Sequence, residues 1–173
     1  MSSDAARRWI EGQGTWFANV CSHDPGRAGR LDETARRLDH PEHAVAQLLV
    51  GEGHDVRSLR EARGRGRTPD LLVCGRGVEV KSWDPLELRG GRPPAARSVV
   101  NKLLDGGGQA AAVVLFGQGS GITPATVRRG LTLYAGHKHG SRVTSARVLG
   151  DGFDLSWSRL HTAGHVRAPI LGL

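Results

Sequence analysis

The sequence has little of several residue types, and each scarcity excludes a class of protein. Two cysteines, Cys21 and Cys74, are too few for a disulfide framework, so we expect reduced thiols and a cytoplasmic site of action. No apolar run approaches the roughly 20 residues that span a bilayer, and we therefore expect no membrane partner. The first residues, MSSDAARRWIEG, lack the apolar segment of a Sec signal peptide, so none is expected.

Lysine is also scarce, because only three lysines (Lys81, Lys102 and Lys138) stand among the 24 Lys and Arg residues. The net charge is +7, and residues 71–140 alone hold nine basic and four acidic side chains. A basic surface favours a polyanionic partner such as nucleic acid. The codon usage of a GC-rich genome would also produce many arginines, so the net charge alone does not establish that the partner is a nucleic acid. A 38% apolar share of 173 residues suits a folded domain rather than a disordered chain.

Apolar periodicity and turn residues predict one domain of the α/β class, with an α+β mixed sheet flanked by helices. We expect an N-terminal helical extension over 1–40, a core over 41–150 and a C-terminal strand or tail over 151–173. The extension includes a polar, solvent-exposed helix over 31–38. The core runs αβββαβ and then αβ, with helices over 41–53, 95–105 and 123–136 and strands over 54–61, 68–74, 78–83, 110–117 and 142–150. An edge strand over 154–160 follows.

The strands over 68–74 and 78–83 are expected to form a hairpin about a Gly75-Arg76 turn. In that register Asp70 lies opposite Lys81 and diagonal to Glu79. Because side chains alternate along a strand, these three residues share one face. The other face is apolar and consists of Leu71, Val73, Val78 and Val80.

The shared face carries the chemistry that we expect of this chain. Asp70 and Glu79, with Cα atoms ~7–8 Å apart, can converge on one hard cation such as Mg²⁺ or Mn²⁺. Such a cation needs only one or two carboxylates besides phosphate oxygens. The Lys81 ammonium can orient an attacking water and stabilise charge on a phosphate. The alternative is a solvated face with an Asp70–Lys81 pair worth about 0.2–1 kcal/mol. The apolar elements on both sides of the hairpin favour a covered face.

Two further groups are candidate site residues. Glu42 stands near the start of the helix over 41–53, at the edge of its apolar stripe, although the helix dipole also favours a glutamate there. Arg63, Arg65 and Arg67 lead into Asp70 and are candidates for contacts to substrate phosphates. The alternative for these arginines is a flexible basic loop.

The pattern Pro69-Asp70…Glu79-Val80-Lys81 resembles the signature of the PD-(D/E)xK nuclease superfamily, which includes restriction endonucleases and Holliday-junction resolvases. The expected order αβββαβ from Pro41 to Phe116 resembles that restriction-endonuclease-like core. The resemblance implies a metal-dependent endonuclease, with metal ligands Asp70, Glu79, the Val80 carbonyl, and Glu42 directly or through water. Lys81 would position or activate the water. An additional polar residue on or after the next helix is implied too, with Asn101, Lys102 and Gln109 as candidates.

Three segments more closely resemble the tRNA-cleaving C-terminal toxin domains of bacterial contact-dependent growth inhibition and polymorphic toxin proteins: EHAVAQLLVGEGHDV, TPDLLVCGRGVEVKSW and GGGQAAAVVLFG. This resemblance covers residues 41–150. It implies tRNA as substrate, delivery into another cell and an immunity protein as partner, which we expect to be acidic because residues 71–140 carry a charge of +5. Such domains are the tips of long proteins, whereas the numbering here begins with Met1 and shows no pre-toxin region, so we expect either a free-standing nuclease or an expressed fragment.

Other functions stay open beside the tRNA-cleaving toxin. A DNA endonuclease of the restriction or resolvase type is the second choice. A nuclease-like module that only binds nucleic acid or protein is the alternative from another class. Some tRNA-cleaving relatives attack with the ribose 2′-OH instead of water, so both hydrolysis and transesterification remain open.

Overall fold

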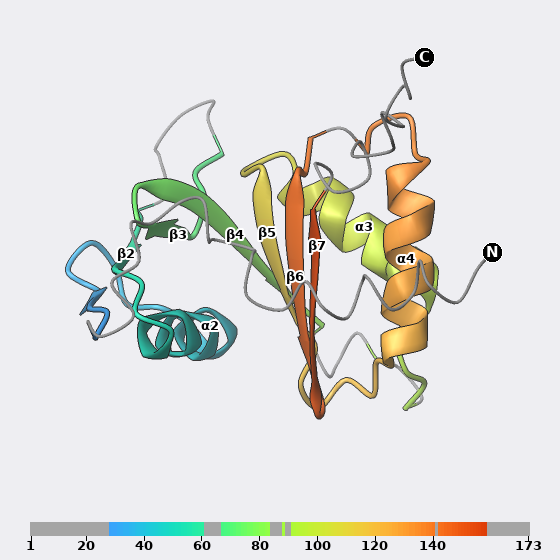
Figure 1. Cartoon of the computed structure of the whole chain (residues 1–173), viewed down its shortest axis with the longest axis horizontal. Helices are drawn as coiled ribbons and strands as arrows, with labels where there is room; N and C mark the ends of the chain where they lie inside the picture. The colour runs from blue at the N-terminus through green and yellow to red at the C-terminus, as the bar shows by residue number, and fades with distance from the viewer. Residues whose placement is uncertain (1–27, 61–66, 84–87, 89–90, 141, 159–173) are drawn as a thin grey trace, which may run out of the picture.

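One seven-stranded mixed sheet organises the chain (Figure 1). The computed structural model describes residues 28–60, 67–83, 88, 91–140 and 142–158. The strands lie in chain order across the sheet, and the pairs β1–β2, β4–β5 and β5–β6 are parallel. Their bounds are β1 (Leu31–Asp32), β2 (Val56–Ser58), β3 (Leu71–Val73), β4 (Arg76–Ser82), β5 (Ala112–Phe116), β6 (Ser145–Gly150) and β7 (Phe153–Ser158). The predicted α/β class with a mixed sheet is confirmed.

Among the described residues, three helices cover the sheet: α2 (His40–Gly51), α3 (Ala96–Gly106) and α4 (Pro124–Ala135). Helix α2 begins at an Asp39 cap and α4 at a Thr123 cap, and each has a proline in its first turn. In Figure 1, α2 lies against the β2–β4 side of the sheet, whereas α3 and α4 pack together beside β5–β7.

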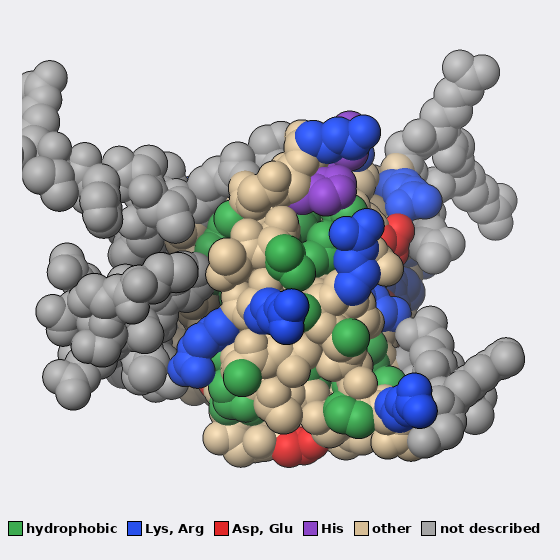
Figure 2. All heavy atoms as spheres, turned by 90° about the vertical axis from the view of Figure 1, so that its right-hand side faces the viewer, with side chains coloured by type: hydrophobic (Ala, Val, Ile, Leu, Met, Phe, Trp, Pro, Cys, Tyr) green, Lys and Arg blue, Asp and Glu red, His purple; other side chains and the backbone are tan. Residues whose placement is uncertain are grey.

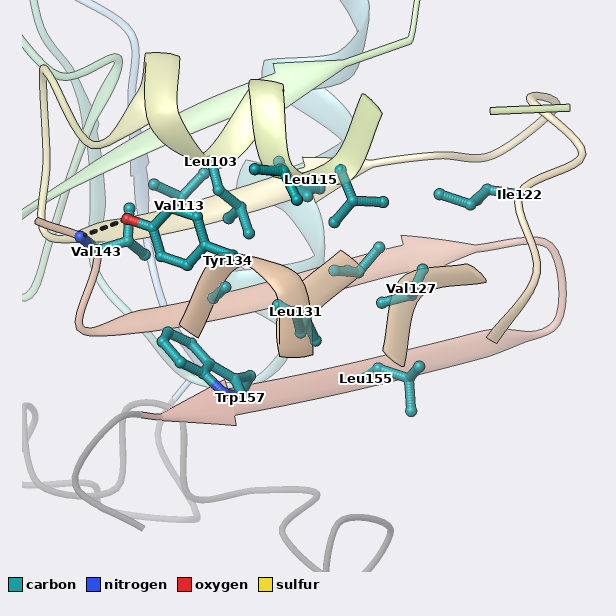
Figure 3. Close-up of a cluster of buried hydrophobic side chains, with 14 of the residues drawn as sticks. Leu103, Val113, Leu115, Ile122, Val127, Leu131, Tyr134, Val143, Leu155 and Trp157 are labelled. Carbon is teal, nitrogen blue, oxygen red and sulfur yellow. Dashed lines mark hydrogen bonds between the residues drawn. The ribbon is translucent and has the colours of Figure 1, made fainter. Parts of the chain in front are cut away.

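Strand β5 is buried along its whole length because both of its faces are covered. Val114 and Phe116 belong to the apolar cluster beneath α2, and Val113 and Leu115 belong to the cluster beneath α3 and α4. Figure 3 shows the second cluster, in which the Tyr134 hydroxyl accepts a hydrogen bond from the Val143 amide at 3.1 Å. The two clusters hold the sheet rigidly between the helices.

The segment over 31–38 is not the solvated helix that its polar pattern predicts. Leu31 pairs with Val56 in a parallel ladder, and irregular backbone follows. The Asp32 carboxylate accepts hydrogen bonds from the Thr34 amide at 3.0 Å and the Thr34 hydroxyl at 2.6 Å. Such a local side-chain bond competes with helix formation. The segment therefore runs across the start of α2 instead of coiling.

The hairpin forms, but its register differs by two residues from the predicted one. The turn is Cys74-Gly75, whose φ angles of 47° and 83° fit a type I′ turn, so Leu71 pairs with Val78 rather than Val80. A shift of two residues leaves every side chain on its predicted face. The predicted Asp70–Lys81 opposition is wrong, because Asp70 lies beside Val80, whose amide donates to Asp70 Oδ2 at 2.9 Å.

Several expectations fall at the limits of the described residues. The helices expected before residue 28, Cys21 and the tail beyond residue 158 lie outside the described part, so the predicted domain boundaries stay predictions. Cys74 is disulfide-bonded, so the expectation of a reduced thiol is wrong for this residue. None of the helices in the described ranges is long and apolar enough to cross a membrane.

Candidate functional site

A group of charged and polar side chains gathers where the start of α2, the start of β3, the second half of β4 and the end of α3 meet. Its carboxylates interact with one another and with two cations. We call this group the carboxylate cluster: Arg36, Glu42, Asp70, Glu79, Lys81, Asp105 and Gln109. Five of its seven members (Glu42, Asp70, Glu79, Lys81 and Gln109) are predicted site residues.

Glu42 is held from two directions and is only 8% exposed. It forms a capping box with Asp39, in which each side chain accepts from the other residue's amide at 3.0 Å. The Arg36 guanidinium donates two hydrogen bonds to the same carboxylate, at 2.5 and 2.7 Å. Burial raises the pKa of Glu42, but Arg36 and the Asp39 amide outweigh burial, so its pKa lies below the ordinary value. Glu42 therefore caps the start of α2 and also lies in the carboxylate cluster, and its role in a functional site stays a prediction.

Asp70 connects the two halves of the cluster. Its Oδ2 accepts from the Val80 amide at 2.9 Å, and its Oδ1 lies 3.2 Å from Arg36 Nη2. Burial and the neighbouring Glu42 carboxylate raise the pKa of Asp70, against the effects of the Val80 amide and Arg36. Burial is the largest of these effects, and the Glu42 carboxylate adds to it because like charges disfavour ionisation.

Glu79 is the most deeply buried member, at 1% exposure. Its Oε1 lies 2.7 Å from Lys81 Nζ and also accepts from the Gln109 side-chain amide. Its Oε2 is buried without a hydrogen-bond partner among the described residues. Burial raises the pKa of Glu79 to about 7, and Asp70 adds to the effect while Lys81 opposes it. A half-satisfied buried carboxylate is costly, and such groups concentrate at functional sites.

Lys81 joins strand β4 to the end of α3. Its ammonium bridges Glu79 and Asp105, which lies 3.2 Å away. Burial lowers the pKa of Lys81, but these two carboxylates outweigh it and leave the pKa above the ordinary value. Lys81 is therefore a cation at neutral pH, suited to stabilising negative charge rather than to removing a proton.

The remaining predicted residues divide into those near the cluster and those away from it. Gln109 reaches Glu79, whereas Asn101 is exposed on α3 and Lys102 is half-buried there. Arg67 is exposed and pairs with Asp105 at 3.1 Å, which places it beside the cluster. Arg63 and Arg65 lie outside the described residues.

Sequence reasoning missed two members of the cluster, Arg36 and Asp105. Arg36 stands in the irregular segment after β1, where no periodicity marks it. Its sequence signal is indirect, because a buried glutamate such as Glu42 needs a cation. Asp105 has a clearer signal, since it is the last charged residue of α3 before three glycines that lead to Gln109.

The oxygen donors of the cluster suit a hard divalent cation, which prefers carboxylate and carbonyl oxygens. The unpartnered Glu79 Oε2 and the Asp70 carboxylate are two such donors. The Val80 carbonyl leaves its strand on the same side as the Val80 amide, toward Asp70. Within the described ranges, no three His, Cys, Asp or Glu side chains form a ready-made metal group. Mg²⁺ commonly takes only one or two protein carboxylates, so the donor set fits it.

Fold and site together define a mixed α/β protein with a half-buried cluster of carboxylates and cations beside the central strands. No protein-family model matches the chain, and no curated protein matches it. Among solved structures, the chain is similar to a chain of a CdiA-CT/CdiI toxin and immunity complex from Burkholderia pseudomallei. The TM-score is 0.45 at 16% identity, over 74% of this chain and 98% of that chain. A likeness this distant assigns neither an activity nor a partner.

Proposed function

We propose that this protein is a metal-dependent endonuclease that cleaves phosphodiester bonds of nucleic acid. One observation carries the proposal: site residues predicted from five separate sequence positions lie in one cluster. Asp70 and Glu42 share Arg36, and Glu79 contacts both Lys81 and Gln109. A buried carboxylate oxygen without a partner is uncommon in a network that only stabilises the fold, and the unpartnered Glu79 Oε2 supports a ligand-binding role.

Asp70 and Glu79 would hold Mg²⁺ or Mn²⁺, with the Val80 carbonyl as a further ligand and Glu42 acting directly or through water. When bound, the cation would supply Lewis-acid stabilisation of the phosphate and a more acidic water. Gln109 donates to Glu79 Oε1 and so orients the carboxylate, leaving Oε2 for the cation. The positive Lys81 orients the attacking group and stabilises the charge that develops on the phosphate.

The resemblance of three segments to tRNA-cleaving toxin domains makes tRNA the first choice of substrate, with DNA second. In the same proposal the protein acts in the cytoplasm of a target cell as a toxin. An acidic immunity protein would then neutralise it. The exposed Arg67 beside the cluster supports contact with a substrate phosphate.

The test is cleavage of total cellular RNA and of plasmid DNA, each with Mg²⁺ and with EDTA. We expect Mg²⁺-dependent cleavage of the RNA pool, and loss of cleavage in Lys81→Ala with nucleic-acid binding retained. Arg76→Ala is the matched control, because Arg76 is an exposed cation on the same strand β4. Its cleavage should equal that of the wild type. Absence of cleavage of both pools by the folded protein would refute the proposal.

A non-catalytic binding module is the second candidate, and the ion pairs of the cluster favour it. Arg36 neutralises Glu42 and Asp70, while Lys81 neutralises Glu79 and Asp105, as in a structural network. For such a module, Lys81→Ala would leave every biological effect unchanged. The same variant therefore separates the two candidates.

A further inference from the structure

A second charged surface lies on the outer face of α4 and on the loop after it. Figure 2 shows Lys, Arg and His side chains along this face, with Asp and Glu only at its margins. The sequence explains the bias, because residues 106–150 contain no Asp or Glu at all. We call these cations the α4 tract: Arg128, Arg129, Lys138 and Arg142.

The cations of the α4 tract differ in their partners from four other arginines of the chain. Arg36, Arg57, Arg67 and Arg147 each pair with a carboxylate. Within the described part of the chain, no acidic side chain pairs with any member of the tract, and Arg129, Lys138 and Arg142 are exposed. The Arg128 Nε is a buried donor without a described acceptor. Positive charge without internal compensation is suited to an external polyanion.

Three consecutive glycines connect this surface to the carboxylate cluster. A Cβ built on Gly106 would lie 3.5 Å from Glu79 Cγ, and one built on Gly107 would lie 3.2 Å from Arg142 Cβ. A Cβ on Gly108 would lie 3.6 Å from Arg67 Nη1. The end of α3 therefore lies close to Glu79 of the cluster, to Arg142 of the tract and to Arg67.

The dimensions of the tract fit the backbone of a nucleic acid. Helix α4 advances about 10 Å from Arg128 to its last residue, Ala135, at 1.5 Å per residue. In a duplex, one strand carries a phosphate about every 3.4 Å along the axis, so this length spans roughly three phosphates. Lys138 and Arg142 follow the helix along the chain, and Arg142 lies beside Gly107.

We propose that the α4 tract binds the sugar–phosphate backbone of the nucleic acid whose cleaved bond lies at the carboxylate cluster. The proposal takes its ligand class from the proposed function. An acidic protein could also cover a basic face, but the row of cations that leads to the cluster through the glycines favours a continuous polyanion.

The test measures binding of a fluorescein-labelled 20-nucleotide RNA stem-loop by fluorescence anisotropy in EDTA, across a series of NaCl concentrations. The tract variant is Arg129→Gln/Lys138→Gln/Arg142→Gln. The control is Arg30→Gln/Arg57→Gln/Arg76→Gln, which removes the same charge at the β1–β4 end of the sheet. We expect weaker binding by the tract variant only. Its slope of log affinity against log salt should fall by about 2–3, as for three lost phosphate contacts.

Equal slopes and affinities in the two triple variants would overturn the proposal and leave the tract to an acidic protein partner. The single variants Lys138→Gln and Arg142→Gln, each lowering the slope by about 0.7–0.9, guard against misfolding of the triple variant. Because binding is measured in EDTA, it does not depend on cleavage. If the tract variant binds RNA more weakly but the wild type cleaves no nucleic acid, the RNA-binding role of the tract is supported and the proposed nuclease function is refuted. If the wild type cleaves RNA but binds it no more tightly than the tract variant does, the proposed role of the tract is refuted and the proposed nuclease function is not.

Discussion

Replacing Arg36 with methionine removes the cation that compensates Glu42 and Asp70 while keeping much of the side-chain length. Arg36 makes two bonds to Glu42, at 2.5 and 2.7 Å, and one to Asp70 at 3.2 Å. Removing one partner of a buried ion pair costs about 3–5 kcal/mol. Because the Arg36 side chain is 25% exposed, we reduce the expected loss of unfolding free energy to roughly 2–3 kcal/mol.

Thermal denaturation followed by circular dichroism measures this loss. For a chain of this size, each kcal/mol corresponds to roughly 2–4 °C in Tm, so Arg36→Met should lower the Tm by about 4–12 °C. The control is Arg57→Met, because Arg57 pairs with Asp32 at 3.1 Å but is 60% exposed. An exposed pair contributes at most about 1 kcal/mol. A Tm loss in Arg36→Met no larger than in the control would refute the reasoning.

The same variant tests whether the carboxylates accept a divalent cation. Without Arg36, Glu42 and Asp70 repel each other, and a bound Mg²⁺ relieves the repulsion. Ligand at 100 times its Kd stabilises the folded state by about 2.7 kcal/mol. We therefore expect Mg²⁺ to raise the Tm of Arg36→Met more than that of the wild type. An equal response of both proteins would contradict a cation site next to Arg36.

Three further predictions concern other parts of the structure. Arg147→Met should destabilise the protein by about 3 kcal/mol in urea denaturation, because buried Arg147 bonds two carboxylates that would lose their cation; an unchanged midpoint would contradict this. Gly130→Ala should cost about 1–3 kcal/mol, since its Cβ would lie 2.5 Å from Val99 Cβ, whereas Gly136→Ala, with no atom nearer than 3.9 Å, should have little effect. Glu79→Gln should stay folded by circular dichroism and lose Mg²⁺-dependent cleavage by about 100-fold or more; retained cleavage would exclude Glu79 as a ligand.

The elements that the sequence predicts well are those whose signals are local. Helix α2 has its proline and its apolar stripe, and β5 is an unbroken apolar run, so both form close to their predicted bounds. The helix predicted over 31–38 does not form, although the segment has an amphipathic pattern. The Asp32 carboxylate accepts the Thr34 amide, and this bond competes with the hydrogen bonds of a helix. The hairpin turn failed because either glycine-containing pair, Cys74-Gly75 or Gly75-Arg76, satisfies the same apolar alternation.

The site follows the same division between local and long-range information. Glu79 and Lys81 share a face because strand alternation requires it, and Glu42 stands at a helix start that its neighbours specify. Arg36 could not be found in this way, because its contact with Asp70 joins residues 34 positions apart through irregular backbone. No period or spacing in the sequence encodes such a contact.

The two-residue shift of the hairpin shows that the apolar core and the carboxylate cluster place different demands on the strand register. Either register buries the same apolar side chains, so the core gives little discrimination between them. Only the register closed at Cys74-Gly75 brings the Val80 amide to Asp70. A substitution that moved the turn to the neighbouring pair could therefore yield a folded, stable and inert protein. The conformation of one tight turn, rather than the packing of the domain, therefore fixes the alignment of the two strands that position Asp70 and Glu79.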